Sequence, residues 1–330
     1  LLPPKIPLSV MNGSHIRSFV MVLALSRSCY SFASPLQKRF AVCKESVTLV
    51  RASIATETGQ ATGKEMNVPL YRSEGLFAVN KPLDWTSNDV VSYIRGILER
   101  DTRNRGGKTT RVGSRRNKSR IVRVGHGGTL DPLATGVLVV GVGRGTKELQ
   151  TYLKGSKKYF ARGEFGFETE TLDKGGNVTT TAPFDHITTE SLLDVIPSFK
   201  GTLQQKPPIF SAIRVKGKRL YEQALDGKTS DDIDIQPREV HVYNLELLNR
   251  QETHLPSFDL DIECGGGTYV RALVRDIAYE LNSVATTTVL TRTKQGQFTL
   301  DDTLEKPDWS ADNIYDAIDK FNAMRDEETG

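Results

Sequence analysis

Cysteine is scarce in this chain of 330 residues, which holds only Cys29, Cys43 and Cys264, far apart from one another. This spacing excludes a disulfide framework and the paired-cysteine pattern of a structural zinc site, so we expect reduced thiols and no metal. Long apolar runs are also missing, and no stretch is long and apolar enough to span a bilayer. The hydrophobic fraction of 38% and the charged fraction of 25% are ordinary for a globular protein.

Charge is unevenly distributed along the chain. The formal net charge is +4, whereas the segment from Arg95 to Arg123 holds eleven basic residues against Glu99 and Asp101. Its many Gly, Ser, Asn and Thr residues predict a basic insertion at about 101–120 that contacts phosphate groups. A solvated insertion or a nuclear targeting segment is the alternative.

Acidic residues are nearly absent from the N-terminal segment, which through position 52 contains seven Lys or Arg residues and one acid, Glu45. Ser and Ala are frequent there, and a short apolar run at 18–25 follows Arg17. This composition is typical of an organellar presequence. We therefore predict that residues 1–66 are an extension that directs the protein to a plastid or mitochondrion. The alternative is a gene start without a targeting role, with the protein in the nucleus or cytoplasm.

One carboxylate stands in an unusual setting, the run from Gly125 to Leu138 with the sequence GHGGTLDPLATGVL. Glycines before Asp131 allow positive φ values and a close approach, while Pro132 fixes its own φ and restricts the residue before it. The apolar segment at 136–143 is bounded by glycines, as a buried strand would be. The pattern predicts Asp131 on a rigid, open loop beside a buried strand.

The remaining elements alternate without a regular βαβ rhythm, which favours an α+β domain around a mixed sheet. Alternating and β-rich segments predict further strands at 75–80, 157–166, 240–248 and 258–264, and a strand with a loop at 286–298. Amphipathic segments predict helices from the N-cap region 86–89 through Ile97, and at 146–153, 192–199, 220–225 and 268–281. In the tail, the helical spacing of Trp309, Ile314, Ile318 and Phe321 predicts one short docking helix.

Three further segments strengthen the case for chemistry at Asp131. Arg271 follows a glycine triplet at the start of a predicted helix, and Tyr159 follows two lysines. Basic residues also surround the apolar positions at 290–298. Taken singly, each candidate residue has an ordinary explanation: Tyr159 and Tyr269 as core tyrosines, His126 as a loop cap, and Arg271 as a member of a surface ion pair.

Together and in order, these segments resemble the TruB-type tRNA pseudouridine synthase family, in the branch that includes the eukaryotic tRNA enzymes. The matching blocks cover roughly residues 74 to 300 and are GLFAVNKP with TSN, the run from Gly125 to Leu138, KY at 158–159, GTYVR ending at Arg271, and LTRT with Gly296 and Phe298.

The resemblance implies roles for seven residues. It assigns Asp131 as the catalytic nucleophile, Tyr159 as the ring that stacks on the target base and is placed to accept a proton, and Arg271 as the partner of the aspartate. It assigns His126 to splaying the target nucleotide, and Lys81, Tyr269 and Leu290 to lining the uracil pocket.

The residue chemistry agrees with these roles. A carboxylate can attack the sugar or the base, or stabilise positive charge on the sugar, and a bidentate guanidinium would keep it ionised and fix its direction. A base that leaves the RNA stack needs an aromatic surface to receive it. The product keeps every atom of the substrate, so no cofactor and no metal is implied.

The resemblance also implies the architecture and the substrate. We expect a pseudouridine synthase fold, with a central mixed, mostly antiparallel sheet flanked by helices and loops. The catalytic domain would span 67–300, and a short acidic tail at 301–330 would leave no room for a PUA domain. The expected activity is pseudouridine formation in the T-loop, at position 55 of tRNA, by a monomer that binds the T-arm, with mRNA as a second candidate substrate.

Two other functions are open. The first is a guide-RNA-dependent enzyme of the H/ACA type, in which a lysine follows the Asp-Pro pair and a PUA domain follows the catalytic domain. Here Leu133 and Ala134 follow that pair, which favours the stand-alone tRNA enzyme. The second is a non-catalytic RNA-binding protein or tRNA chaperone, and the intact Asp131, Tyr159 and Arg271 argue against it.

Overall fold

The computed structural model describes residues 68–107, 122–230, 232–249 and 255–329, and these residues all fall within one compact unit. The predictions for residues 1–66 and for most of the basic insertion lie outside the described residues. The part of the insertion that is described continues a helix to Asn104, instead of beginning a loop at 101. None of the described helices is both long and apolar enough to cross a membrane.

The centre of the fold is a mixed sheet, to which ten strands contribute within the described residues. Its main path runs β14-β1-β3-β12-β4-β11-β10-β7, while β2 pairs with β3 and β13 with β12. Only the β1–β14 and β3–β12 pairs are parallel, which confirms the predicted mixed, mostly antiparallel sheet. The strands are β1 (Gly75–Lys81), β2 (Val124–His126), β3 (Ala134–Val142), β4 (Lys157–Phe165), β7 (Gly201–Gln205), β10 (Arg238–Leu247), β11 (Ser257–Cys264), β12 (Ala285–Gln295), β13 (Phe298–Thr299) and β14 (Thr303–Leu304).

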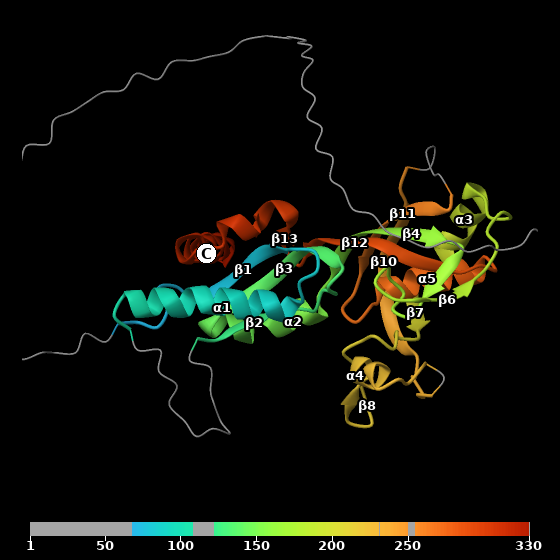
Figure 1. The fold of residues 1–330 in the computed structure, drawn as a ribbon. Helices are drawn as coiled ribbons and strands as arrows, with labels where there is room; N and C mark the ends of the chain where they lie inside the picture. Colours follow the sequence, from blue (N-terminus) through green and yellow to red (C-terminus); the bar gives the residue numbers. More distant parts are fainter. Residues whose placement is uncertain (1–67, 108–121, 231, 250–254, 330) are drawn as a thin grey trace, which may run out of the picture. The chain divides into compact units, whose positions relative to one another are not determined.

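Helices cover different parts of this sheet (Figure 1). The α-helices are α1 (Ser87–Asn104), α2 (Leu149–Lys154), α3 (Thr189–Val195), α4 (Leu220–Leu225), α5 (Val270–Glu280) and α6 (Ala311–Thr329). Helix α1 lies at the β1–β3 end of the sheet, and α5 packs against β12 and β4. Two small hairpins, β5 (Phe167–Thr169) with β6 (Val178–Thr181) and β8 (Arg214–Val215) with β9 (Lys218–Arg219), lie outside the sheet. Short 3-10 helices occupy Gly143–Lys147, Ile196–Phe199, Leu300–Asp302 and Lys306–Asp308.

Helix α1 forms because its sequence supplies both a cap and an apolar face. The Thr86 hydroxyl accepts from the Asp89 N–H, and the Asp89 carboxylate accepts from the Thr86 N–H, so two N–H groups at the helix start are satisfied. The apolar face that follows buries Val90 and Ile94 completely. The sequence prediction of this cap and helix is confirmed.

Strand β1 lies between two hydrophobic cores. Phe77 and Val79 face the larger core, which also contains the apolar faces of α1 and α5, whereas Leu76 and Ala78 face a smaller one beneath α2. Because successive side chains on a strand point to opposite faces, this alternation buries both faces of β1.

The C-terminal segment belongs to the same unit. Strand β14 pairs with β1, and α6 packs against β1 with Ile314 and Ile318 in the larger core and Phe321 in the smaller one. The predicted tail helix is present but spans nineteen residues, so the expectation of a short helix was wrong, and Trp309 precedes it. Helix α6 therefore packs on the end of the sheet formed by β1 and β14.

Candidate active site

Five of the seven predicted site residues meet in one pocket with a cavity volume of about 110 Å³. They are Asp131, Tyr159, Tyr269, Arg271 and Leu290. Thr129, Leu130, Ala212, Thr268 and Val270 complete the lining. The pocket joins the loop before β3, strands β4 and β12, the start of α5 and the segment after β7, which are far apart in the sequence. Among the described residues, no group of three or more His, Cys, Asp or Glu side chains is arranged to hold a metal ion.

The loop that carries Asp131 depends on its glycines. Gly128 has a φ of +148°, and a Cβ there would lie 3.3 Å from the Gln295 amide nitrogen. After the loop, Gly136 has a φ of +104°, and a Cβ there would lie 2.2 Å from the Arg292 carbonyl oxygen. Both positions favour glycine by conformation, and at Gly136 the backbone of Arg292 also leaves no space for a side chain. Asp131 itself keeps a third of its side chain exposed, so its carboxylate is open to a ligand.

Arg271 lies in the first turn of α5 and is the buried partner of Asp131. Its Nε lies 2.8 Å from Asp131 Oδ2, and only 4% of its side chain is exposed. Its Nη1 donates to the Thr171 carbonyl and its Nη2 to the Phe210 carbonyl, the latter at 3.1 Å. The predicted bidentate pairing is therefore replaced by a single nitrogen–oxygen contact, because the other two nitrogens bind backbone carbonyls. Arg271 thus connects the Asp131 loop to two other loops.

A second carboxylate, Asp173, was missed by the sequence reasoning. Its Oδ2 lies 3.5 Å from Arg271 Nη1, and its Oδ1 accepts from the Thr171 hydroxyl at 2.7 Å and from the Gly175 N–H at 3.0 Å. These bonds orient the loop that also presents the Thr171 carbonyl to Arg271. The signal was present in the sequence, since Thr171, Asp173 and Gly175 are typical turn residues, but it gave no indication of contact with Arg271.

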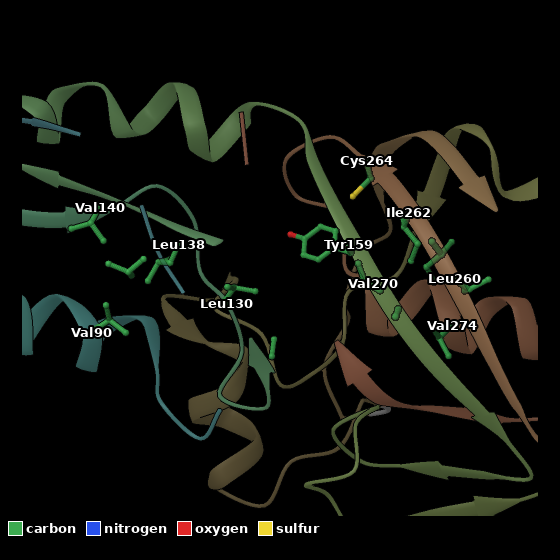
Figure 2. Close-up of a cluster of buried hydrophobic side chains, with 14 of the residues drawn as sticks. Val90, Leu130, Leu138, Val140, Tyr159, Leu260, Ile262, Cys264, Val270 and Val274 are labelled. Carbon is green, nitrogen blue, oxygen red and sulfur yellow. The ribbon is translucent and has the colours of Figure 1, made fainter. Parts of the chain in front are cut away.

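The two tyrosines of the pocket are held in different ways. Tyr159 projects from β4 between the part of the core with Leu130 and Leu138 and the part with Val270 (Figure 2). Burial raises the pKa of the Tyr159 phenol, while the Arg292 charge opposes that shift. The backbone of Tyr269 is clamped, because its N–H donates to Gln205 Oε1 at 2.8 Å and its carbonyl accepts from Gln205 Nε2 at 3.1 Å. Burial also raises the pKa of Tyr269, so both phenols are neutral at neutral pH.

Lys81 lies behind the Asp131 loop and is not part of the pocket lining. Its fully buried ammonium donates to the carbonyls of Pro82, Trp85 and Pro132 at 2.7, 2.6 and 3.1 Å. Burial lowers the pKa of Lys81 to about 8, although the nearby Asp131 carboxylate acts in the opposite direction. The geometry therefore gives Lys81 contact with the backbone of the loop and none with the pocket.

His126 also lies outside the pocket lining, at the end of β2 in a neighbouring groove shared with Asn88 and Arg123. Its Nδ1 accepts from the Gly128 N–H at 3.3 Å, so the imidazole is tied to the start of the Asp131 loop. Burial lowers the pKa of His126, and the Arg292 charge lowers it further. The ring is therefore uncharged at neutral pH.

We expect the free energy of unfolding to fall as the pH drops below about 6.5, the ordinary histidine value, because the unfolded chain then binds a proton that folded His126 resists. Each unit by which folding lowers the His126 pKa removes about 1.4 kcal/mol from the free energy of unfolding once the histidine is protonated in both states. Urea unfolding at pH 7.5 and pH 5.5 measures the loss, and His126→Gln is the control, since it removes the titrating group. Equal losses in the two proteins would contradict the assignment to His126.

Comparison with known proteins identifies the family. Residues 116–270 match the family model described as TruB family pseudouridylate synthase (N terminal domain). The chain is 39% identical over 288 residues to Pseudouridylate synthase TRUB1 of Mus musculus, covering 84% of this chain and 82% of the mouse protein. It is 41% identical over 228 residues to tRNA pseudouridine synthase B of Caldanaerobacter subterraneus subsp. tengcongensis, covering 69% of this chain and 71% of the bacterial protein. The chain therefore belongs to the TruB pseudouridylate synthase family, which confirms the predicted family and makes it an isomerase.

Solved structures add a similar chain. A chain in the Crystal Structure of a Cbf5-Nop10-Gar1 Complex has a TM-score of 0.49 and 26% sequence identity to this protein. The match covers 71% of this chain and 53% of that one, so this chain spans about half the length of that relative.

Proposed function

We propose that this enzyme converts uridine to pseudouridine in the T-loop of tRNA, at position 55, with Asp131 as the catalytic nucleophile. One observation carries the proposal: an accessible carboxylate is ion-paired with a buried guanidinium in a pocket that also contains two neutral tyrosines. The names of the relatives, pseudouridylate synthase and tRNA pseudouridine synthase B, support RNA as the substrate and tRNA as its class.

The pocket residues divide the reaction between them. The C1′–N1 bond of uridine breaks, the uracil turns, and a C1′–C5 bond forms, after which C5 loses a proton and N1 gains one. Asp131 can displace N1 from C1′ and be displaced in turn when C5 bonds to C1′, or it can add to the base and be eliminated after the base has turned. It can also stabilise the positive charge that develops on the sugar without forming a bond. Arg271 keeps the carboxylate oriented through the 2.8 Å contact. The flipped base stacks on Tyr159, whose neutral phenol can accept the C5 proton only after losing its own.

Several finer features belong to the same proposal. We propose that the protein acts as a monomer on the T-arm, with mRNA as a further substrate class. The basic composition at 101–120 supports additional contacts with RNA phosphates, and that of 1–66 supports action on tRNA in a plastid or mitochondrion. Leu133 and Ala134 after the Asp-Pro pair support a stand-alone enzyme over a guide-RNA-dependent one.

The proposal is tested with an isolated T-arm stem-loop RNA and the purified protein. We expect pseudouridine at position 55 and at no other uridine, measured by chemical mapping of the product. The matched control is the same RNA with cytidine at that position, which should remain unmodified. Modification at another position, or dependence on an added guide RNA, would contradict the proposal.

A further inference from the structure

Every backbone carbonyl of the loop Gly127–Pro132 has a hydrogen-bond donor. Two of the donors are backbone groups, the N–H of Ala134 on the Asp131 carbonyl at 3.0 Å and the N–H of Asp84 on the Pro132 carbonyl at 2.9 Å. The remaining donors are side chains: Gln295 on Gly127 (2.7 Å), Arg292 on Gly128 (3.3 Å) and Thr129 (3.5 Å), Ser87 on Leu130 (3.0 Å), and Lys81 on Pro132 (3.1 Å). These four side chains are at most 2% exposed. The loop is therefore fixed from behind, along its whole length, by buried polar groups.

Arg292 binds more carbonyls of this loop than any of the other three side chains. It binds two successive loop carbonyls, and its Nε donates to the Val137 carbonyl of β3 at 2.7 Å. One planar guanidinium thus spans the loop and the strand that follows it. Because the guanidinium is rigid, its three contacts fix the orientation of the loop relative to β3, the strand that follows it.

Arg292 is also the cross-strand neighbour of Tyr159. In the β12–β4 pairing, Arg292 lies directly opposite Tyr159, and in the β12–β3 pairing it lies opposite Gly136. The register of β12 against β4 shifts between Arg292 and Lys294, so Arg292 and Gln295 are both fully buried although they are three positions apart. This bulge lets two side chains of one strand reach the same loop.

The charge of Arg292 has no acidic partner in the part of the chain that the structure describes. Arg292 donates to three backbone carbonyls and also interacts with the Tyr159 phenol, whereas Arg271 is paired with Asp131. Burying a cation without a carboxylate is costly, and carbonyl dipoles offset that cost only in part. The Arg292 charge lowers the pKa of the Tyr159 phenol and the Asp131 charge raises it, so both charged groups lie near this ring.

We propose that Arg292 is a positioning residue of the reaction: it holds the Gly128–Thr129 segment so that the Asp131 carboxylate meets a base stacked on Tyr159. The proposal rests on the proposed function. It goes beyond it by assigning a role to a residue that does not line the pocket and acts through the loop backbone. Displacement of a reacting group by about 1 Å is enough to cost roughly 100-fold in rate.

The test compares Arg292→Met with Arg95→Met on T-arm RNA that the wild-type protein is first shown to modify. Arg95 is also a buried arginine that donates to a backbone carbonyl, but its bond goes to Val124 of β2 at 3.1 Å, whereas Arg292 binds carbonyls of the Asp131 loop. Both variants lose a buried guanidinium and should have a lower melting temperature. At a temperature where both remain folded, we expect kcat to fall roughly 100-fold for Arg292→Met, with KM changed by less than about threefold. We expect kcat to be nearly unchanged for Arg95→Met.

Two further measurements separate positioning from general stability. Arg292→Lys keeps the charge and one set of donors, and we expect it to recover part of the lost kcat even if Arg292→Met folds poorly. Added guanidinium should raise the kcat of Arg292→Ala and leave that of Arg95→Ala unchanged. Equal kcat losses for the two methionine variants at equal loss of stability, or a loss confined to KM, would overturn the proposal. Absence of wild-type activity on this RNA would instead contradict the proposed function.

Discussion

Asp131→Asn is expected to lower the rate of pseudouridine formation by roughly 10⁴-fold or more, because it replaces the nucleophile with a neutral amide. The fold should persist, since Arg271 keeps its bonds to the Thr171 and Phe210 carbonyls and its contact with Asp173. Single-turnover formation of pseudouridine measures the rate, and filter binding measures RNA affinity. RNA affinity should change by less than about threefold, since RNA binding depends mainly on phosphate contacts.

The matched control is Asp259→Asn. It also removes a carboxylate from an arginine pair, with contacts to Arg162 of 2.6 and 2.7 Å, but that pair lies on the exposed side of β11 and β4. Its rate should equal that of the wild type. If Asp131→Asn kept the cellular function of the protein while losing pseudouridine formation, the RNA chaperone alternative would be favoured. If it kept full activity, Asp131 would not be the nucleophile.

The second large effect is expected for Arg271→Lys. A lysine keeps the charge but presents one ammonium, which cannot contact Asp131 and the Thr171 and Phe210 carbonyls in the geometry of the guanidinium. We expect kcat to fall roughly 10²- to 10³-fold, as for other lost electrostatic contacts in active sites. The free energy of unfolding should fall by about 2–4 kcal/mol, because buried carbonyls lose their donors.

Arg275→Lys provides the control within the same helix. Arg275 lies one turn further along α5 and donates to the Lys206 carbonyl at 3.2 Å, so it also fastens α5 to the segment after β7. It makes no ion pair with Asp131, and its variant should retain activity within about threefold. A kcat for Arg271→Lys in that same range would show that the ion pair is dispensable.

Local sequence signals predicted most of the fold. The capping residues of α1, the glycine-bounded run of β3 and the amphipathic pattern of α5 depend on neighbouring residues only, and the corresponding elements are present. The extent of α6 was underestimated because its apolar positions are widely spaced and its flanks are highly charged. Its packing on both sides of β1 is a tertiary effect that no local pattern encodes.

The site was harder to predict where it depends on contacts between residues that are far apart in the sequence. The backbone of Asp173 forms a β-bridge with Thr287, and its carboxylate pairs with Arg271. Turn residues alone reveal neither of these long-range contacts. Lys81 was expected in the pocket, but the turn that follows β1 folds its ammonium onto three backbone carbonyls. The contacts of Arg292 depend on a bulge, which breaks the two-residue period used to assign strand faces.

The position of β12 has a consequence for synthesis of the enzyme. This strand lies between β3 and β4, although both leave the ribosome long before it does. Asp131, Tyr159 and Arg271 all precede β12, so a nascent chain that ends after α5 contains all three without the strand that holds them together. Pairings of such long sequence separation form late. We therefore expect the growing polypeptide to form no pseudouridine until β12 has emerged, although it already contains all three reactive side chains.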